Sequence, residues 1–444
     1  AIIQYANDGL FVSSSTAVYV TRFIADMEAV NNYAIPVIRC IRRAGWVGNK
    51  EFFPYCLASP MKGLEETENS EKFLEHLHTE GDKDLWLKTA AKVRTMPLAR
   101  AMLAASFASP LLLPLQHRNI FYHSWCDTKS GKTAALKFAM SVWGDPAALM
   151  KSYFATMVGM EHRAGTMKHL PLALDELQTI EKKLDINNMV YTLGNGVGKT
   201  RGRAGGGIRA IDEWRNCIIS TGEQPISSDN SMDGINTRLL EVYGKPVATE
   251  AVAREMYHVS ERNYGFAAEP YVRFVIDHID NLKEDFESMQ SSLDMLYGDG
   301  NVSAENIAVL SLADYYSSIC IFGMEKEAAW NEAVEMGAAL MNVQKQEDHT
   351  DTVDRAWNFI TGWVAGNKKK FTEGVYEPPE IYGIVEDGKV CVICGALNTA
   401  LEEAGYSYRK CIRGFSERGY LRTNVDSDGR KRTQGLKRVK GIPT

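Results

Sequence analysis

The chain has 444 residues, of which 45% are hydrophobic and 24% are charged, and its formal net charge is −6. This composition is typical of a globular protein of about two to four domains, and it excludes a disordered or collagen-like chain. Because the net charge is negative, any contact with nucleic acid has to come from local basic segments.

The first part of the chain carries no motif with recognisable chemistry. The stretch AVYVTRFIADMEAV, from Ala17, predicts a helix, and we expect residues 1–95 to form a helical N-terminal region. The apolar stretch 101–115 predicts a buried helix followed by a loop. It contains two prolines and is shorter than the roughly 20 residues that a membrane helix needs, so we expect no contact with a membrane.

The tripeptide Gly-Lys-Thr occurs twice, at 131–133 and at 198–200. The first copy follows a β-prone run, residues 119–125, and precedes a helical pattern that ends near Gly144. A strand, a loop and a helix in this order predict a phosphate-binding loop, because the loop amides and the helix dipole face the anion. The motif departs from its usual form at its first position, where Cys126 replaces glycine.

This loop predicts an ATP site with Mg²⁺ as its cofactor. Lys132 is expected to reach the β and γ phosphates, and the Thr133 hydroxyl is expected to bind Mg²⁺. The expected ATP-binding residues are Cys126, Asp127, Thr128, Lys129, Ser130, Gly131, Lys132 and Thr133.

Two adjacent acids follow the next apolar run. Residues 170–174 lead into Asp175 and Glu176, 43 residues after Lys132. A buried strand that ends in this pair predicts Asp175 as a ligand of Mg²⁺, directly or through water, and Glu176 as the general base for hydrolysis. The alternative is an exposed acidic pair at the start of a helix.

A third buried strand is predicted over residues 216–225. It places Ser220 and Thr221 at its carboxyl end, where chemistry sits in α/β sheets. Thr221 is the candidate that senses the γ-phosphate. The alternative is a Thr-Gly turn without a role.

The C-terminal residues, 368–444, predict a winged helix. A helix at LNTALEEAG, a second over 407–419 and two strands around an Asp428-Gly429 turn follow in that order. From residue 401 onward, 11 Lys and Arg stand against 5 Asp and Glu, which indicates a local nucleic-acid footprint. The alternative is a wing that contacts protein. The expected duplex-binding residues are Arg409, Lys410, Arg413, Arg430, Lys431 and Arg432.

The eight cysteines are scattered along the chain, with one CxxC pair at Cys391 and Cys394. A zinc site needs further ligands, but Cys411 is the only other candidate nearby and no histidine follows His349. We therefore interpret these cysteines as small core residues. Unpaired cysteines are typical of a reducing compartment, so we expect a cytoplasmic protein.

Five separated blocks of the sequence carry a family resemblance. They are RRAGWVGNKEFFPY, SGKTAALKFAMSVWGDP, LALDEL, YTLGNGVGKTRGRA and EWRNCIISTGE. The chain resembles, over roughly residues 8–270, the helicase-like ATPase domain of prophages, plasmids and integrating elements. Its relatives are the MCM-like helicases of staphylococcal cassette chromosomes, which belong to the AAA+ superfamily.

The resemblance implies an α/β fold with a P-loop AAA+ ATPase core at 96–250. Residues 251–348, which are largely helical by periodicity, take the place of the helical lid. The family further implies an ATP-driven homo-oligomeric ring, a hexamer, that translocates on single-stranded DNA during replication of a mobile element.

In such rings a hairpin just before the third-motif strand projects into the central channel. The Gly-rich basic segment 194–215 has that position here, and its cations are suited to phosphates. The alternative is a solvated surface loop. The expected DNA contacts are Lys199, Arg201, Arg203 and Arg209.

Ring ATPases of this family complete each ATP site with an arginine from the neighbouring subunit. Arg238 has the expected position after the third-motif strand, and Arg215 is the second candidate. An ordinary surface arginine is the alternative.

These expectations describe an ATP-dependent DNA helicase. The alternative from another class is a DNA-binding replication initiator or scaffold with a weak or degenerate ATP site, an alternative that the departure at Cys126 keeps open. A third reading is a ring motor that acts on protein or packages DNA.

Overall fold

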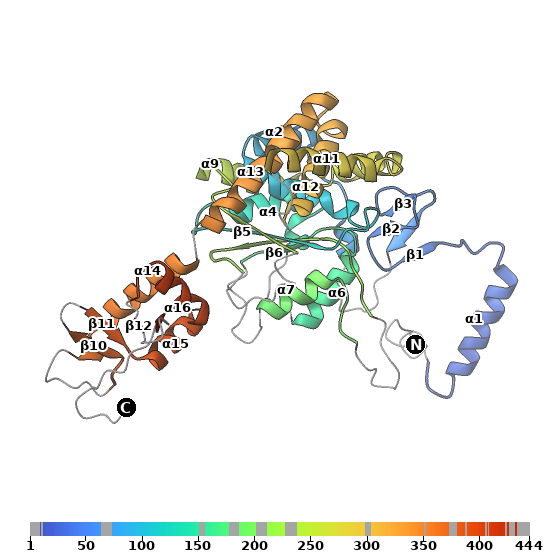
Figure 1. The fold of residues 1–444 in the computed structure, drawn as a ribbon. Coiled ribbons are helices and arrows are strands. Elements are labelled where there is room, and N and C mark those ends of the chain that lie inside the picture. Colours follow the sequence, from blue (N-terminus) through green and yellow to red (C-terminus); the bar gives the residue numbers. More distant parts are fainter. Residues whose placement is uncertain are drawn as a thin grey trace.

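The computed structural model describes residue 9 and residues 12–63, 73–150, 156–176, 186–200, 211–226, 238–297, 303–349, 352–372, 380–386, 389–404, 406, 408–421, 424–425 and 431–432. A parallel sheet of four strands lies near its centre (Figure 1). The strands are β5 (Ile120–Trp125), β6 (Leu172–Leu174), β7 (Cys217–Gly222) and β8 (Leu239–Tyr243), in the spatial order β6-β7-β5-β8.

The three strands predicted from apolar runs are confirmed as β5, β6 and β7. Every residue of β6 and β7 is buried, as is typical of a parallel sheet covered on both faces. β7 pairs in parallel with both β5 and β6. The carboxyl ends of these three strands therefore lie side by side at one edge of the sheet.

Helices cover both faces of this sheet (Figure 1). On one face, α3 (Pro97–Ala108) and α4 (Lys132–Met140) belong to a large hydrophobic cluster with Ile120 and Tyr122 of β5. On the other face, α6 (Met157–Met167) and α7 (Ile186–Asn195) form a smaller cluster that contains Phe121. The buried helix predicted within residues 101–115 is confirmed as α3, although it begins earlier, at Pro97, and the predicted helix after the loop is confirmed as α4.

A helical layer follows the sheet in the chain, as the periodicity of residues 251–348 predicts. Its helices are α9 (Glu250–Arg262), α10 (Ala268–Asp277), α11 (Leu282–Tyr297), α12 (Ala304–Cys320) and α13 (Lys326–His349). α12 is mostly buried and packs against α3, α11 and α13. These helices share the large hydrophobic cluster with α2 (Lys83–Arg94) and with the sheet.

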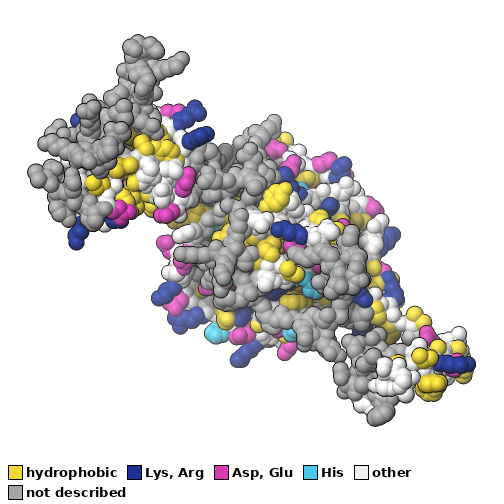
Figure 2. Space-filling model, turned by 90° about the horizontal axis from the view of Figure 1, so that it is seen from below, with side chains coloured by type: hydrophobic (Ala, Val, Ile, Leu, Met, Phe, Trp, Pro, Cys, Tyr) yellow, Lys and Arg dark blue, Asp and Glu magenta, His cyan; other side chains and the backbone are white. Residues whose placement is uncertain are grey.

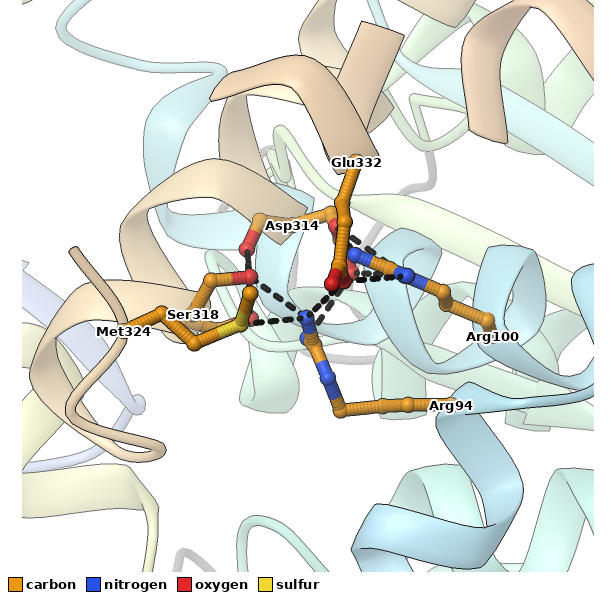
Figure 3. A network of polar contacts seen from close by, with 7 residues as sticks. Arg94, Arg100, Asp314, Ser318, Met324 and Glu332 are labelled. Carbon is orange, nitrogen blue, oxygen red and sulfur yellow. Dashed lines mark hydrogen bonds and ion pairs between the residues drawn. The ribbon is translucent and has the colours of Figure 1, made fainter. Parts of the chain in front are cut away.

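A buried ionic network joins α2 and α3 to this helical layer (Figure 3). Asp314 of α12 is 2% exposed and accepts hydrogen bonds from Arg94, at 3.1 Å, and from Arg100, at 2.6 Å. Glu332 of α13 contacts Arg100 at 2.8 Å. Because two carboxylates balance two guanidinium groups, the buried charge is neutralised. Removal of Asp314 alone would cost about 3–5 kcal/mol.

The N-terminal region is only partly helical, which corrects the expectation for residues 1–95. It contains α1 (Ala17–Asn31), β1 (Arg39–Ile41), β2 (Gly45–Val47), β3 (Glu51–Phe53), β4 (Met61–Gly63), the 3-10 helix η2 (Phe73–His76) and α2. β1 pairs with β4 and β2 pairs with β3. These pairings join short segments whose alternation is too brief to predict strands.

Helix α1 is confirmed, and it extends away from the rest of the protein (Figure 1). None of its residues is buried. Tyr19, Phe23 and Val30 are 75%, 64% and 70% exposed. Hydrophobic side chains therefore lie on the surface at the end of the molecule formed by α1 (right in Figure 2).

The C-terminal unit lies beside the main body (Figure 1) and has its own hydrophobic cluster. Its elements are α14 (Thr352–Gly366), η5 (Lys368–Lys370), β9 (Phe371–Thr372), β10 (Gly383–Glu386), β11 (Lys389–Val392), α15 (Cys394–Glu403), α16 (Tyr408–Glu417), β12 (Asn424–Val425) and β13 (Lys431–Arg432). The predicted order of two helices and a pair of strands is confirmed. The core of this unit also includes α14, through Ala356 and Ile360.

Two shorter helices, η3 (Ser109–Leu111) and α5 (Pro146–Leu149), complete the described elements. Within the described part of the chain, no helix combines the length and the apolar character that a membrane crossing requires. The cysteines differ from the expectation of core residues at three positions. Cys40, Cys391 and Cys394 are exposed, whereas Cys411 is buried as predicted.

Candidate functional site

The predicted phosphate loop joins β5 to α4 at the carboxyl edge of the sheet. Gly131 is the N-cap of α4 and has a φ of 84°, a conformation that favours glycine. A Cβ at Gly131 would lie 2.7 Å from the Cβ of Val247, so there is no room for a side chain at this position. The first amides of α4 have no partner within the helix and are available to an anion.

The amino group of Lys132 lies against the inner side of this loop. It donates to the backbone oxygens of Cys126 and Asp127 at 2.6 and 2.8 Å, and to Ser130 Oγ at 3.1 Å. Cys126 is buried and donates its backbone N–H to the oxygen of Gly222. Positive φ values in this loop occur at Lys129 and Gly131 and not at Cys126, so the backbone has no need of glycine at that position.

Three of the predicted site residues meet at the ends of three different segments. The Asp175 carboxylate follows β6, and its Oδ1 accepts a hydrogen bond from Thr133 Oγ1 of α4 at 3.1 Å. The same oxygen accepts a hydrogen bond from Thr221 Oγ1 of β7 at 2.6 Å. The parallel pairing of β6 with β7 explains this meeting, because it aligns Leu174 with Ser220, one residue before each group.

Glu176 lies beside this group and is exposed. Its backbone N–H donates to Thr221 Oγ1 at 3.1 Å. Its φ of 53° is rare for a residue with a side chain and turns the chain away from the direction of β6. Strained backbone of this kind clusters at functional sites, so the conformation is compatible with the predicted role of Glu176.

The residues present fit ATP and Mg²⁺. A hydroxyl oxygen of Thr133 and a carboxylate oxygen of Asp175 lie 3.1 Å apart, and oxygen atoms are the ligands that Mg²⁺ prefers. The loop amides and Lys132 provide the positive groups that phosphates require. Thr128 and Asp127 lie in the same loop and are exposed.

His123 is a buried polar residue of the neighbouring strand that the sequence analysis did not single out. It is fully buried in β5, its Nε2 lies 2.9 Å from the backbone oxygen of Gln224, and its Nδ1 lies 2.7 Å from Ser220 Oγ. Because a carbonyl oxygen only accepts, Nε2 carries the hydrogen and Nδ1 accepts from Ser220. Burial lowers the pKa of His123 and favours this neutral form. In the sequence, a lone histidine in an apolar run is indistinguishable from a core residue.

Arg238 and the phosphate loop lie at opposite edges of the sheet. Arg238 directly precedes β8 and is therefore at the amino edge of the sheet, whereas Lys132 and Asp175 are at the carboxyl edge. Its guanidinium carbon lies 5.9 Å from the centre of the Tyr191 ring. Arg215 precedes β7 and is also at the amino edge.

The predicted hairpin is paired at its base, which we define as residues 196–199 and 211–214. Val197 and Glu213 form an antiparallel bridge, and Gly198 donates to the oxygen of Asp212 at 2.8 Å. Lys199 lies in this base. Arg201, Arg203 and Arg209 lie outside the described residues.

The predicted duplex-binding residues belong to α16 and to the strands that follow it. Arg409 and Arg413 are exposed, while Cys411 and Phe415 are buried on the other side of the helix. The backbone positions of Lys431 and Arg432 lie in β13, which pairs with β12. Arg430 and the side chain of Lys410 are outside the described part of the structure.

The fold and the site define an α/β protein with a strand-loop-helix site and a separate C-terminal helix-turn-helix unit. Residues 1–213 match the family described as a domain of unknown function, DUF927, and residues 351–442 match the Cch helix turn helix domain. No curated protein matches the sequence.

One solved structure is similar in fold over nearly the whole chain. The structure titled "SCCmec type IV Cch - active helicase" matches with a TM-score of 0.61 and 17% identity, over 97% of this chain and 84% of its own. The apo structure of the NrS-1 C-terminal region covers 61% of this chain and 73% of its own at 12% identity, with a TM-score of 0.27. That second similarity is too low to carry an argument. The predicted resemblance to the helicase-like proteins of staphylococcal cassette chromosomes is thus confirmed, and the chain has the fold of a Cch helicase.

Proposed function

We propose that this protein is an ATP-dependent DNA helicase that acts in the replication of a mobile genetic element. One observation carries the proposal: Thr133, Asp175 and Thr221 converge beside the loop of Lys132. Hydrolysis of ATP needs a phosphate cradle, a Mg²⁺ ligand pair and a base at one place, and this edge of the sheet offers all of them. The similarity to a Cch helicase and the helix-turn-helix match agree with a helicase-like replication protein.

Each residue of the site has a proposed role. The loop from Cys126 to Gly131 and the Lys132 amino group bind the phosphates, and Thr133 and Asp175 hold Mg²⁺. When bound, the ion neutralises phosphate charge. Glu176 accepts the proton of the attacking water, and Thr221 positions Glu176 and Asp175.

The architecture that we propose is a P-loop AAA+ core at 96–250, a helical lid at 251–348 and a winged helix at 368–444. The core order β6-β7-β5-β8 places the strand of Thr221 between the strand of the acids and the strand of the loop. Arg238 and Arg215 at the opposite edge are suited to the ATP site of a neighbouring subunit, which supports a homo-oligomeric ring, a hexamer. The protein is proposed to be cytoplasmic.

DNA is proposed to bind at two places. The hairpin binds single-stranded DNA through Lys199, Arg201, Arg203 and Arg209. The C-terminal unit binds duplex DNA through α16, whose Arg409 and Arg413 are exposed, and through Lys410, Arg430, Lys431 and Arg432.

The test is the rate of ATP hydrolysis with and without single-stranded DNA. The wild-type chain is expected to hydrolyse ATP faster with DNA. Lys132→Ala should abolish turnover in both conditions, because the phosphate-binding cation is lost, whereas Lys199→Ala should retain most of the DNA-free rate. A chain that binds DNA but shows no turnover would instead support the alternative function, an initiator or scaffold with a degenerate ATP site.

A further inference from the structure

The hairpin base lies on α6, the helix that leads into the strand of the acid pair. Glu161 of α6 is 1% exposed, and its Oε2 accepts the backbone N–H of Lys199 at 3.2 Å. A carboxyl group at this depth needs hydrogen-bond partners, and the hairpin backbone supplies one. Glu161 therefore fixes the first arm of the base through its backbone and leaves the Lys199 side chain free for other contacts.

The second arm of the base contacts α6 through Asp212. A Cβ at Gly165 would lie 2.8 Å from the Cβ of Asp212, closer than real Cβ contacts, so the glycine permits this approach. The Asp212 carboxylate lies 3.1 Å from Arg43 Nη2 and 3.5 Å from His162 Nδ1. The arm is thus held between α6 and the segment before β2. Arg43 also offsets one of the acidic charges in the predicted DNA-binding segment.

Two segments of the chain, one through α6 and β6 and the other through β7, connect the hairpin base to the candidate ATP site. After α6, the oxygen of Lys168 accepts the backbone N–H of Arg215 at 2.9 Å, which joins the two routes at their start. One route continues through β6 to Asp175, and the other continues through β7 to Thr221. The six residues of β7 span roughly 20 Å. The hydrogen bond between Thr221 and Asp175 joins the routes again at their end.

The β6 route is bounded by two residues in unusual backbone conformations. Lys168 has a φ of 48° and Glu176 has a φ of 53°. Such conformations are rare for residues with side chains and persist only where the surroundings hold them. Here the hairpin strand holds the first, through Arg215, and Thr221 holds the second. A shift of the hairpin base would therefore change the position of Glu176, the proposed general base.

We propose that Glu161 and Gly165 are positioning residues that couple DNA contact at the hairpin to hydrolysis at the acid pair. This inference rests on the proposed function. DNA that displaces the hairpin moves α6 and β6 with it, because the two arms are seated on the helix at Glu161 and at Gly165. The coupling acts through the contacts that Glu161 and Gly165 make with the two arms of the hairpin base. It is therefore separate from the DNA contacts made by basic side chains.

The experiment measures ATP turnover across a series of single-stranded DNA concentrations in the full-length protein. Glu161→Ala is expected to lower the ratio of DNA-stimulated to DNA-free turnover by at least about fivefold, while the DNA concentration for half-maximal effect changes little, because the cations remain. Glu161→Gln should restore the ratio, since the amide oxygen also accepts the Lys199 N–H. Gly165→Ala should lower the ratio as well, although alanine favours helix.

Arg163→Ala is the matched control on the same helix. Arg163 bonds the oxygen of Leu149 at 2.5 Å and lies over the Phe73 ring, contacts that involve neither arm of the base. This variant should keep the wild-type ratio. Wild-type stimulation retained in both Glu161→Ala and Gly165→Ala would overturn the inference alone. A wild-type chain without DNA-stimulated turnover would overturn the proposed function, and the inference with it.

Discussion

The hydroxyl group of Thr221 donates to Asp175 Oδ1 at 2.6 Å, and its oxygen accepts the backbone N–H of Glu176 at 3.1 Å. Thr221 is 1% exposed, so solvent does not compete for either hydrogen bond. One side chain thus sets the position of both acids. Thr221 stays the candidate that senses the γ-phosphate, and these two contacts add a proposed role in orienting the acid pair.

The first prediction concerns this hydroxyl. Thr221→Val keeps the shape of the side chain and removes both hydrogen bonds, so ATP turnover should fall by about ten- to hundredfold. Thr221→Ser should retain most of the activity. Steady-state turnover and nucleotide binding would be measured for each variant. Equal activity in Thr221→Val and wild type would contradict the orienting role.

The second prediction concerns Glu176. Glu176→Gln should bind ATP normally and hydrolyse it poorly, because the amide keeps the side-chain shape and cannot accept the proton of water. The expected loss of turnover is at least about a hundredfold, since general-base catalysis typically contributes that much. Glu223→Gln, after β7, serves as a control at another exposed acid. Wild-type hydrolysis in Glu176→Gln would exclude this residue as the base.

The third prediction concerns the arginine at the amino edge of the sheet. Arg238→Ala subunits and Lys132→Ala subunits should each be inactive alone, and a mixture should recover part of the activity. Recovery is expected because some interfaces of a mixed ring join an intact loop to an intact arginine. Turnover would be measured against the mixing ratio. Mixed assemblies without recovery would point to Arg215 or to obligatory coordination of all sites.

The fourth prediction concerns duplex binding by α16. Changing Arg409, Lys410 and Arg413 together to Ala should weaken duplex binding and reduce its salt dependence, by up to about 0.9 log unit per lost phosphate contact and decade of salt. Affinity would be measured across a salt series. Arg273→Ala is the matched control, because Arg273 and Arg413 are both exposed and each pairs with a glutamate four residues away. An unchanged salt slope in the triple variant would indicate a unit that contacts protein.

The fifth prediction concerns pH and His169. Its Nδ1 accepts the backbone N–H of Trp46 at 3.1 Å, and its ring is 3% exposed. Burial, followed by the charges of Lys168 and Arg215, lowers the pKa of His169 from 6.5 to about 3. In the window between these values the unfolded chain binds more protons than the folded chain. Stability is therefore fully present above about pH 6.5 and falls as the pH is lowered, by at most about 1.4 kcal/mol per pH unit.

Urea unfolding at about pH 7.5 and about pH 5 measures this effect. His169→Gln retains an acceptor for the Trp46 N–H and does not titrate, so its unfolding free energy should change less between the two conditions than that of wild type. The same change in both proteins would show that the acid sensitivity arises elsewhere.

Local patterns in the sequence are sufficient to predict several parts of the site. The strands that lead to Trp125, Asp175 and Thr221 are short apolar runs bounded by polar residues, and a sheet buried on both faces requires such runs. The loop before Lys132 can be predicted from neighbouring residues alone, because a strand, a glycine-containing turn and a helix follow each other directly. The buried face of α16 is also predictable from local spacing, because residues three to four positions apart lie on the same side of a helix. Cys411 and Phe415 are buried as that spacing predicts.

Contacts between segments that are distant in the sequence could not be predicted in this way. Thr221 and Asp175 are 46 residues apart and touch because β7 pairs with β6, a choice of neighbour that no local pattern encodes. Arg43 and Asp212 are 169 residues apart, and their contact depends on how the N-terminal segment lies against α6. The buried partners of His123 and Glu161 are likewise set by packing. The spacing of hydrophobic residues predicts which face of a helix or strand is buried. Which other element packs on that face depends on the topology of the fold and on the close packing of side chains.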